Sequence, residues 1–176
     1  MDELNETLQP TQISESLKQH HERIKEALPT VLDDTGDARR SAFARVRRML
    51  AAHEALEQEV VHPQAKRDVD DDAVDARIEE EEEAGDAIAK LEGMDVDSPE
   101  FEESYSRFML DVIAHAEHEE HEEFDKINTE LSGSDAERFR TGMRLVEDAD
   151  QTTGAQSRGQ ESFEELLENA KKWIDG

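Results

Sequence analysis

The sequence predicts an all-α protein: an antiparallel up-down-up-down four-helix bundle with two additional C-terminal helices. Two observations predict this class. Apolar residues recur at steps of three and four along four long segments, as they do on one face of an α-helix. No apolar run of period two marks a strand, and the aromatic residues that strands favour make up only 5% of the chain. Short polar segments join the four helices, which is typical of antiparallel neighbours in a bundle.

The first half of the predicted bundle follows a flexible N-terminal tail at residues 1–10. The first helix spans about residues 11–32, and Pro29 is expected to kink it or to end its first part. After a polar turn the second helix begins. We expect it to stop at the pair His62-Pro63, because proline interrupts a helical hydrogen-bond ladder.

The second half begins after a charged segment at residues 66–72, which is expected to be a loop. The third helix is expected to end at Gly93. Ser98-Pro99 then opens the fourth helix, with serine as the capping residue and proline in the first turn. This helix is expected to continue to the end of the bundle, which as a whole covers residues 11–131.

Residues 132–176 are expected to form a C-terminal helical extension. Its helices are predicted at about residues 135–147 and 161–174, with a flexible loop at residues 151–160 between them. The last helix either docks on the bundle or supplies a surface for a partner. The second alternative allows a homo-oligomer that forms through this helix.

The composition excludes several classes of function. There are 47 acidic against 20 basic residues, so the formal net charge is -27. Such a surface repels nucleic acid and anionic membranes, and neither is expected as a partner. The absence of cysteine excludes disulfides, thiolate metal sites and cysteine nucleophiles. No segment approaches the roughly 20 apolar residues of a membrane span, and no signal peptide is visible, so we expect a cytoplasmic protein.

Two polar pairs interrupt the apolar stripes of the second and fourth helices. They are His53 with Glu57, and His115 with Glu119. Residues one turn apart face the same side of a helix, so each pair shares the side that the stripe predicts to be core. Buried polar groups need partners, and a metal shared between facing helices would satisfy both pairs.

The stripes of the other two helices give further candidates. On the first helix the spacing places His21 inward, although His20 fits nearly as well. On the third helix it selects Glu81 from the run Glu79–Glu83, whose other four members are expected to be solvated. The predicted metal ligands are His21, His53, Glu57, Glu81, His115 and Glu119.

Three imidazoles and three carboxylates exceed what a single tetrahedral zinc ion requires. They suit two metal ions bridged by carboxylates, a site that the cores of helical bundles can hold. Glu57 and Glu119 are the natural bridges, because each lies one turn from a histidine. The absence of thiolate argues against copper(I) and iron–sulfur centres. We expect two iron ions as cofactors, with manganese or zinc as alternatives.

Three segments make the chain resemble the hemerythrin-like, HHE cation-binding domain family over about residues 13–131. The segments are Gln19–Ile24, His53–Pro63 and His115–Glu119. The resemblance selects His21 over His20. It also implies Glu54 as an additional ligand, because some members carry a metal-binding glutamate directly after the histidine of the second helix.

The chain departs from the family pattern on the third helix. Oxygen-carrying hemerythrins have two histidines there. This chain has no histidine between His62 and His115, and Glu81 takes the aligned position. By resemblance, His21 and His53 would serve one metal, and Glu81 and His115 the other. A carboxylate in place of imidazole is a harder, negatively charged ligand, which favours ferric iron or manganese. Oxidation or peroxide turnover is therefore favoured over reversible oxygen carriage.

The remaining histidines of the bundle are expected to lie outside the site. His62 is interpreted as a cap on the end of the second helix. His118 and His121 point away from the predicted core face and are expected to be solvated.

The leading hypothesis is a non-haem dinuclear metal protein that binds or reacts with O₂, peroxide or NO. It would act as an oxidoreductase if turnover follows binding, and as a sensor or carrier if it does not. Iron storage or buffering is the alternative, and a metal-free structural protein is the third class. Metal content separates the three, because storage requires more than two metal ions per chain.

Overall fold

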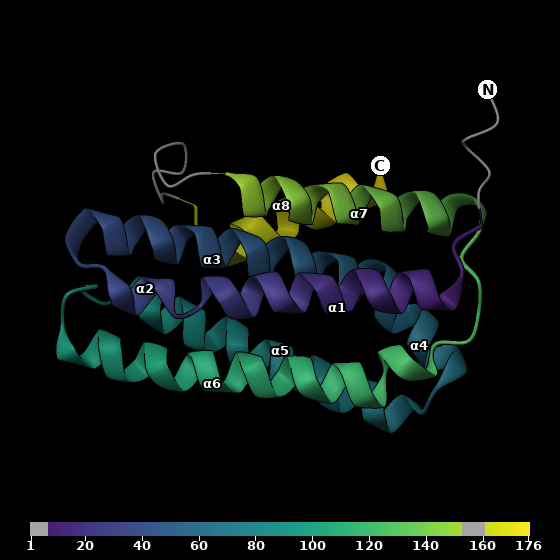
Figure 1. Ribbon diagram of the computed structural model, residues 1–176, viewed down its shortest axis with the longest axis horizontal. Coiled ribbons are helices and arrows are strands. Elements are labelled where there is room, and N and C mark those ends of the chain that lie inside the picture. The colour runs from purple at the N-terminus through teal and green to yellow at the C-terminus, as the bar shows by residue number, and fades with distance from the viewer. Residues whose placement is uncertain (1–6, 153–160) are drawn as a thin grey trace.

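The computed structural model describes residues 7–152 and 161–176, whose regular structure is helical apart from one isolated β-bridge. Four long helices lie side by side along the long axis of the molecule, and the chain runs back and forth between its two ends (Figure 1). They are α1 (Pro10–Ala27), α3 (Gly36–Leu56), α5 (Asp71–Glu92) and α6 (Pro99–Glu122). The predicted all-α bundle is confirmed. In the described part of the chain, no helix has the length and apolar character that crossing a membrane requires.

Pro29 ends the first helix, one of the two outcomes that the sequence predicts. Proline has no N–H to continue the hydrogen-bond ladder, and its ring collides with the preceding turn. Accordingly α1 ends at Ala27, and the short helix α2 (Thr30–Asp33) follows. The Thr30 hydroxyl donates a hydrogen bond to the Ala27 carbonyl at 2.6 Å, which closes the break.

The second helix does not stop at His62-Pro63, and this prediction is wrong. α3 passes into a π-helical turn, Glu57–Val61, and then into α4 (His62–Asp68). Within this π turn the His62 N–H donates to the Glu57 carbonyl, five residues back. Pro63 has no N–H to donate and needs room around its ring, and the wider turn accommodates both.

The charged segment that was expected to be a loop is largely helical. α4 extends to Asp68, and the break before α5 is confined to the two residues Val69 and Asp70. The Asp70 carboxylate accepts a hydrogen bond from the Asp72 N–H at 3.1 Å and so caps α5. A short connection of this kind holds α4 and α5 as adjacent antiparallel elements.

The fourth helix is shorter than predicted. Ser98 caps it as expected, with its hydroxyl accepting from the Phe101 N–H at 3.1 Å. α6 ends at Glu122, and a 3₁₀ turn (Phe124–Lys126) follows in place of continued α-helix. Beyond it Leu131 pairs with Leu8 through two backbone hydrogen bonds of 2.8 and 3.0 Å, so the chain there is extended.

The C-terminal helices dock on the bundle, as the first of the two predicted alternatives has it. α7 (Gly133–Gln151) and α8 (Phe163–Asp175) form a layer against α3 (Figure 1). Phe163 and Ile174 of α8 are buried in the two apolar clusters that also contain bundle residues. Trp173 on the same helix remains 71% exposed. Most of the predicted loop, residues 153–160, lies outside the described residues, as do residues 1–6 of the predicted tail.

Gly142 permits the close approach of α7 to α3, and its replacement by alanine is expected to destabilise the protein. A Cβ atom at Gly142 would lie 2.6 Å from Leu56 Cδ1 and 3.1 Å from Leu56 Cβ. Leu56 is fully buried, and its Cβ and Cγ atoms also lie within 3.2 Å of the new atom, so a rotation of its Cδ1 end alone does not relieve the contact. Overpacking of this kind costs about 1–3 kcal/mol, more than the roughly 1 kcal/mol that alanine gains over glycine in a helix.

Urea denaturation measures this effect, and Gly85→Ala is the matched control. At Gly85 the new Cβ would lie at an ordinary contact distance of 3.7 Å from the Phe163 ring. Gly85→Ala should therefore leave the free energy of unfolding unchanged or raise it. Equal stability of the two variants would show that α7 can move away from α3 without cost.

Candidate metal centre

Two fully buried carboxylates, Glu57 and Glu119, form the middle of the site. Glu57 begins the π turn after α3, Glu119 lies near the end of α6, and both side chains are 0% exposed. None of their four carboxylate oxygens has a hydrogen-bond partner among the described residues. Burying a carboxylate without such partners is costly, so these side chains require cations beside them.

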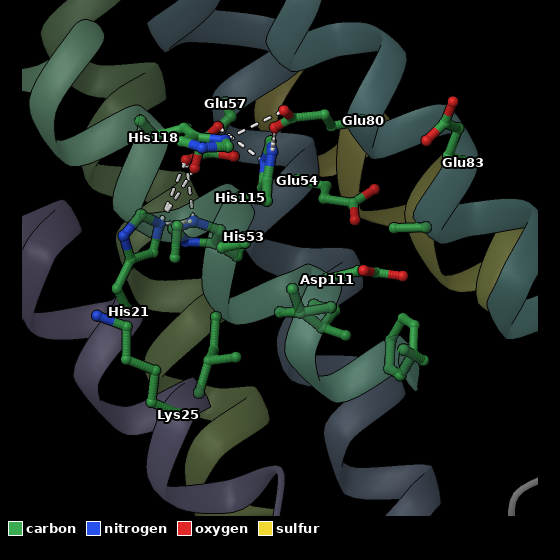
Figure 2. A pocket seen from close by; sticks show the side chains of 18 of the residues that line it. His21, Lys25, His53, Glu54, Glu57, Glu80, Glu83, Asp111, His115 and His118 are labelled. Carbon is green, nitrogen blue, oxygen red and sulfur yellow. Dashed lines mark hydrogen bonds and ion pairs between the residues drawn. The ribbon is translucent and has the colours of Figure 1, made fainter. Parts of the chain in front are cut away.

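Two histidines complete a first cluster with these carboxylates. His21 of α1 and His53 of α3 point their Nε2 atoms at each other across 2.9 Å. His53 Nε2 lies 2.9 Å from Glu57 Oε1, and His21 Nε2 lies 3.3 Å from Glu119 Oε2. One ligand atom from each of the four residues falls within 4.8 Å of all the others. Figure 2 shows His21, His53 and Glu57 converging on this point.

The same two carboxylates belong to a second cluster with His62 and Glu81. His62 Nε2 lies 2.5 Å from Glu81 Oε1, and both residues are 2% exposed. One ligand atom from each of Glu57, His62, Glu81 and Glu119 again falls within 4.8 Å of the others. Glu57 and Glu119 thus stand between two groups of ligand-type side chains.

His115 lies at the edge of the second cluster. Its Nε2 atom is 3.0 Å from Glu119 Oε1 and 3.9 Å from Glu81 Oε1. The side chain is 17% exposed, so this is the most solvent-accessible of the four histidines that face the centre. The two clusters thus contain five of the six sequence-predicted ligands and add His62 to them, while the sixth, His115, lies beside the second cluster in contact with Glu119.

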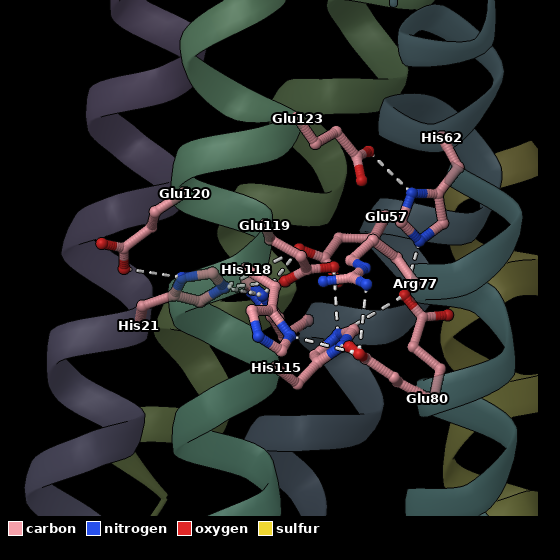
Figure 3. Close-up of polar contacts among 12 residues, drawn as sticks. His21, Glu57, His62, Arg77, Glu80, His115, His118, Glu119, Glu120 and Glu123 are labelled. Atoms are coloured by element: carbon pink, nitrogen blue, oxygen red, sulfur yellow. Dashed lines mark hydrogen bonds and ion pairs between the residues drawn. The ribbon is translucent and has the colours of Figure 1, made fainter. Parts of the chain in front are cut away.

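An outer carboxylate contacts the second nitrogen of three of these histidines. The Nδ1 atom of His21 lies 2.9 Å from Glu120, that of His62 lies 2.7 Å from Glu123, and that of His115 lies 2.7 Å from Glu80 (Figure 3). A carboxylate beside Nδ1 favours a proton there, so Nε2 is the nitrogen that can bind a metal ion. Histidines that bind metals in proteins are usually oriented in this way.

Glu80 is held in place by a buried arginine. Arg77 of α5 is 7% exposed, and its guanidinium lies 3.2 Å from Glu80 Oε1. Glu80 was expected to be solvated with most of its acidic run, and this expectation is wrong, whereas Glu79, Glu82 and Glu83 are exposed. Only the partners on α6 distinguish Glu80 from its neighbours, so the run itself carries no signal for it.

His62 is not the helix cap that the sequence suggested. In a regular α-helix, residues five positions apart lie about 140° apart around the axis. The π turn from Glu57 to Val61 brings His62 back over Glu57, so that both face the centre. A proline six residues after Glu57 was the available signal that the helix departs from regular spacing there. π turns inside helices are frequent at functional sites.

His20, Glu54, His118 and His121 lie outside both clusters. His20 is buried and packs edge-on against the His53 ring, and burial together with the His53 charge lowers its pKa to about 3. Glu54 is 6% exposed, but neither cluster contains it. His118 and His121 are exposed, as predicted, although His118 Nδ1 lies 3.2 Å from Glu80.

The carboxylates dominate the electrostatics of the centre. Burial alone lowers the pKa of His21, but the facing carboxylates of Glu119, Glu120 and Glu57 outweigh burial and hold the pKa well above its usual value. In the same way Glu123 and Glu81 raise the pKa of His62. Burial raises the pKa of Glu57, yet the neighbouring His53 and His21 hold it well below the usual range. The centre therefore attracts positive charge, whether protons or metal ions.

The residues present fit a metal pair. The His21 and His53 Nε2 atoms, 2.9 Å apart, are close enough to be ligands of one ion. The unpartnered oxygens of Glu57 and Glu119 face both clusters. Imidazole and carboxylate together suit iron, manganese or zinc.

Comparison with family models decides which family the chain represents. The model described as the hemerythrin HHE cation binding domain matches residues 12–127, which include every residue of both clusters. The chain belongs to this family. The predicted resemblance is thereby confirmed, and the HHE domain is a metal-binding domain. Searches of curated proteins and of solved structures found no match to the chain.

The metal affinity of the HHE domain is expected to rise with pH, and binding is expected to release protons. Burial lowers the pKa of His115, but Glu119 outweighs it and raises this pKa to about 10. The metal-free protein therefore holds a proton on His115 at neutral pH, and the raised pKa values of His21 and His62 favour protons on these histidines too. Metal ions bind neutral imidazole, so each displaced proton changes the affinity about tenfold per pH unit.

The raised pKa of His115 also determines how the stabilisation of the protein by metal depends on pH. Because the folded pKa of His115 lies above the unfolded value of about 6.5, its contribution to metal-free stability is complete below pH 6.5 and is lost as the pH rises toward 10. Added metal should therefore stabilise the protein more at pH 9 than at pH 6. Urea denaturation with and without zinc at the two pH values measures this difference, with His118→Ala as a control that behaves like the wild type. A difference that shrinks as the pH rises would contradict the assignment.

Proposed function

We propose that the HHE domain holds two iron ions and binds or reacts with a small oxidant or gas: O₂, peroxide or NO. One observation carries this proposal. Glu57 and Glu119 belong to two clusters of four ligand-type residues, so that two metal ions would share these carboxylates. A site for a single ion would need only one such group.

The ligand chemistry supports iron, with manganese as the alternative. Of the eight places in the two clusters, five are filled by carboxylates, counting Glu57 and Glu119 twice, and three by imidazoles. Oxygen-rich sites with imidazole favour iron and manganese over the softer metals that bind thiolates. When bound, an iron pair supplies electrons to a small oxidant or gas that reaches it.

The chain's own side chains would orient and shield this centre. Glu120, Glu123 and Glu80 keep the Nδ1 protons on His21, His62 and His115, so the Nε2 lone pairs stay directed inward. Phe124 packs beside the His21 ring with a centroid distance of 5.2 Å and excludes water from that side. The partly exposed His115 marks the side from which a small molecule can approach.

Metal analysis and optical spectroscopy of protein purified from its own host test the proposal. We expect two iron ions per chain and, after exposure to air or peroxide, an absorption band of a bridged ferric pair. Consumption of peroxide or O₂ over many turnovers would indicate an enzyme, and reversible binding of one equivalent a sensor or carrier. More than two iron ions per chain would replace the proposal by iron storage, and protein without metal would overturn it.

A further inference from the structure

A cavity of about 290 Å³ opens beside the metal centre, and O₂ or peroxide does not require its size. Its lining includes His21, His53, Glu57, His115 and Glu119, so it reaches the centre directly (Figure 2). An apolar cavity of about 150 Å³ already binds benzene, and one water molecule takes about 30 Å³ of liquid volume. The cavity is thus large enough for an organic molecule of several heavy atoms.

The wall of the cavity away from the metal centre is apolar. Leu50 of α3 and Phe108 and Val112 of α6 line it, and all three are buried. The facing residues of α5, Ala84 and Ala87, end at Cβ and leave the space between the helices unfilled. Small side chains at these two positions therefore create room for the apolar body of a ligand.

Glu54 is a buried polar group in this wall, whereas Glu83 and Asp111 beside it are exposed. Glu54 is 6% exposed and makes no hydrogen bond or ion pair with the described residues. In Figure 2 its carboxyl group stands apart from the ligand clusters and projects into the space between Glu83 and Asp111. A buried polar group of this kind requires a partner. A ligand hydroxyl or amino group can hydrogen-bond to a carboxyl group in either protonation state.

The charged side chains near Glu54 disfavour an anion in that part of the cavity. Glu80, Glu83 and Asp111 contribute acidic side chains to the lining, and Lys25 is the single lysine or arginine there among the described residues. Beside Glu54 a carboxylate ligand would face these acidic groups, whereas a neutral or cationic ligand would not. Only at the metal ions would a carboxylate be attracted.

We propose that this cavity binds a small organic molecule that has an apolar body and a hydroxyl or amino group, with the polar group at Glu54 and the body against Ala84 and Ala87. Such a molecule would be a second ligand of the centre, beside the oxidant. That the molecule serves as a second ligand of the metal centre rests on the proposed function. The binding itself follows from the cavity.

Isothermal titration of the purified, metal-containing protein with phenol, benzylamine, toluene and benzoate tests the proposal. We expect phenol and benzylamine to bind and toluene to bind more weakly. Any binding of benzoate should be unaffected by Glu54→Leu, because the metal ions and not Glu54 would attract it. Ala84→Leu and Ala87→Leu should each weaken phenol binding about tenfold or more by filling the space. Ala76→Leu makes the same change on α5 outside the cavity lining and should bind phenol like the wild type.

The role of Glu54 has its own test. Glu54→Leu should remove the preference for phenol over toluene, while Glu54→Gln should keep it. Metal content is measured on every sample, so the two proposals fail separately. Protein that lacks metal but binds phenol would overturn the proposed function alone. The cavity proposal would be overturned if metal-loaded protein bound none of the four ligands. It would also be overturned if Ala84→Leu and Ala87→Leu both bound phenol as tightly as the wild type.

Discussion

Replacement of Glu57 by glutamine is expected to remove both metal ions at once. Glu57 belongs to both clusters, and the amide is neutral and a poorer ligand than the carboxylate. Glutamine has nearly the same size, so the helix around it should remain intact. Metal content should fall from two ions per chain to nearly none, with an unchanged circular dichroism spectrum.

Glu59→Gln provides the matched control for this variant. Glu59 lies in the same π turn, is partly exposed and belongs to neither cluster. It should keep both metal ions. Retention of one metal ion by Glu57→Gln would mean that the two clusters do not share this carboxylate. Loss of metal from both variants would point to disruption of the turn rather than of the ligand.

Replacement of His62 by phenylalanine is expected to remove one metal ion and leave the other. His62 belongs only to the second cluster, whereas His21 and His53 belong only to the first. Phenylalanine keeps a planar ring of similar size in place of the imidazole, so it should be accommodated beside Pro63. Metal content should fall to one ion per chain, and the absorption band of a bridged ferric pair should disappear.

A substitution of Glu123, the carboxylate beside His62 Nδ1, should weaken binding of the second metal ion without abolishing it. Glu123→Gln leaves His62 in place but weakens its contact at Nδ1, now 2.7 Å from Glu123. Loss of such a partner lowers metal affinity by about 10–100-fold, so Glu123→Gln should bind the second ion more weakly without losing it. If His62→Phe still bound two metal ions tightly, His62 would not be a metal ligand and would have only a structural role.

Helical spacing predicted those parts of the centre that lie on regular α-helix. His53, Glu81 and Glu119 interrupt apolar stripes at steps of three and four, and each is buried facing the centre. The spacing could not separate His20 from His21, because both are buried. Only the contacts of His21 with Glu119 and Glu120 distinguish them, and these depend on how α1 packs against α6.

The parts that were missed depend on departures from regular helix or on tertiary contacts. His62 reaches the centre only because a π turn shifts the angular position of everything after it. Glu80 and Glu123 acquire their roles from histidines on other helices, 35 and 61 residues away in the chain. A pattern within one helix carries no information about such partners. The end of α6 was placed too late for a related reason, since the chain there leaves the helix to pair with Leu8.

The layer formed by α7 and α8 has a consequence for where this protein can be cut. The family match ends at residue 127, yet α3 is enclosed by the metal-binding helices on one flank and by the last two helices on the other. A fragment that ended where the family match ends would expose the apolar surface of α3 that α7 and α8 cover. This surface includes Leu56, which lies against Gly142. The segment that defines the family is therefore shorter than the smallest fragment of this chain that we expect to fold with its apolar core buried.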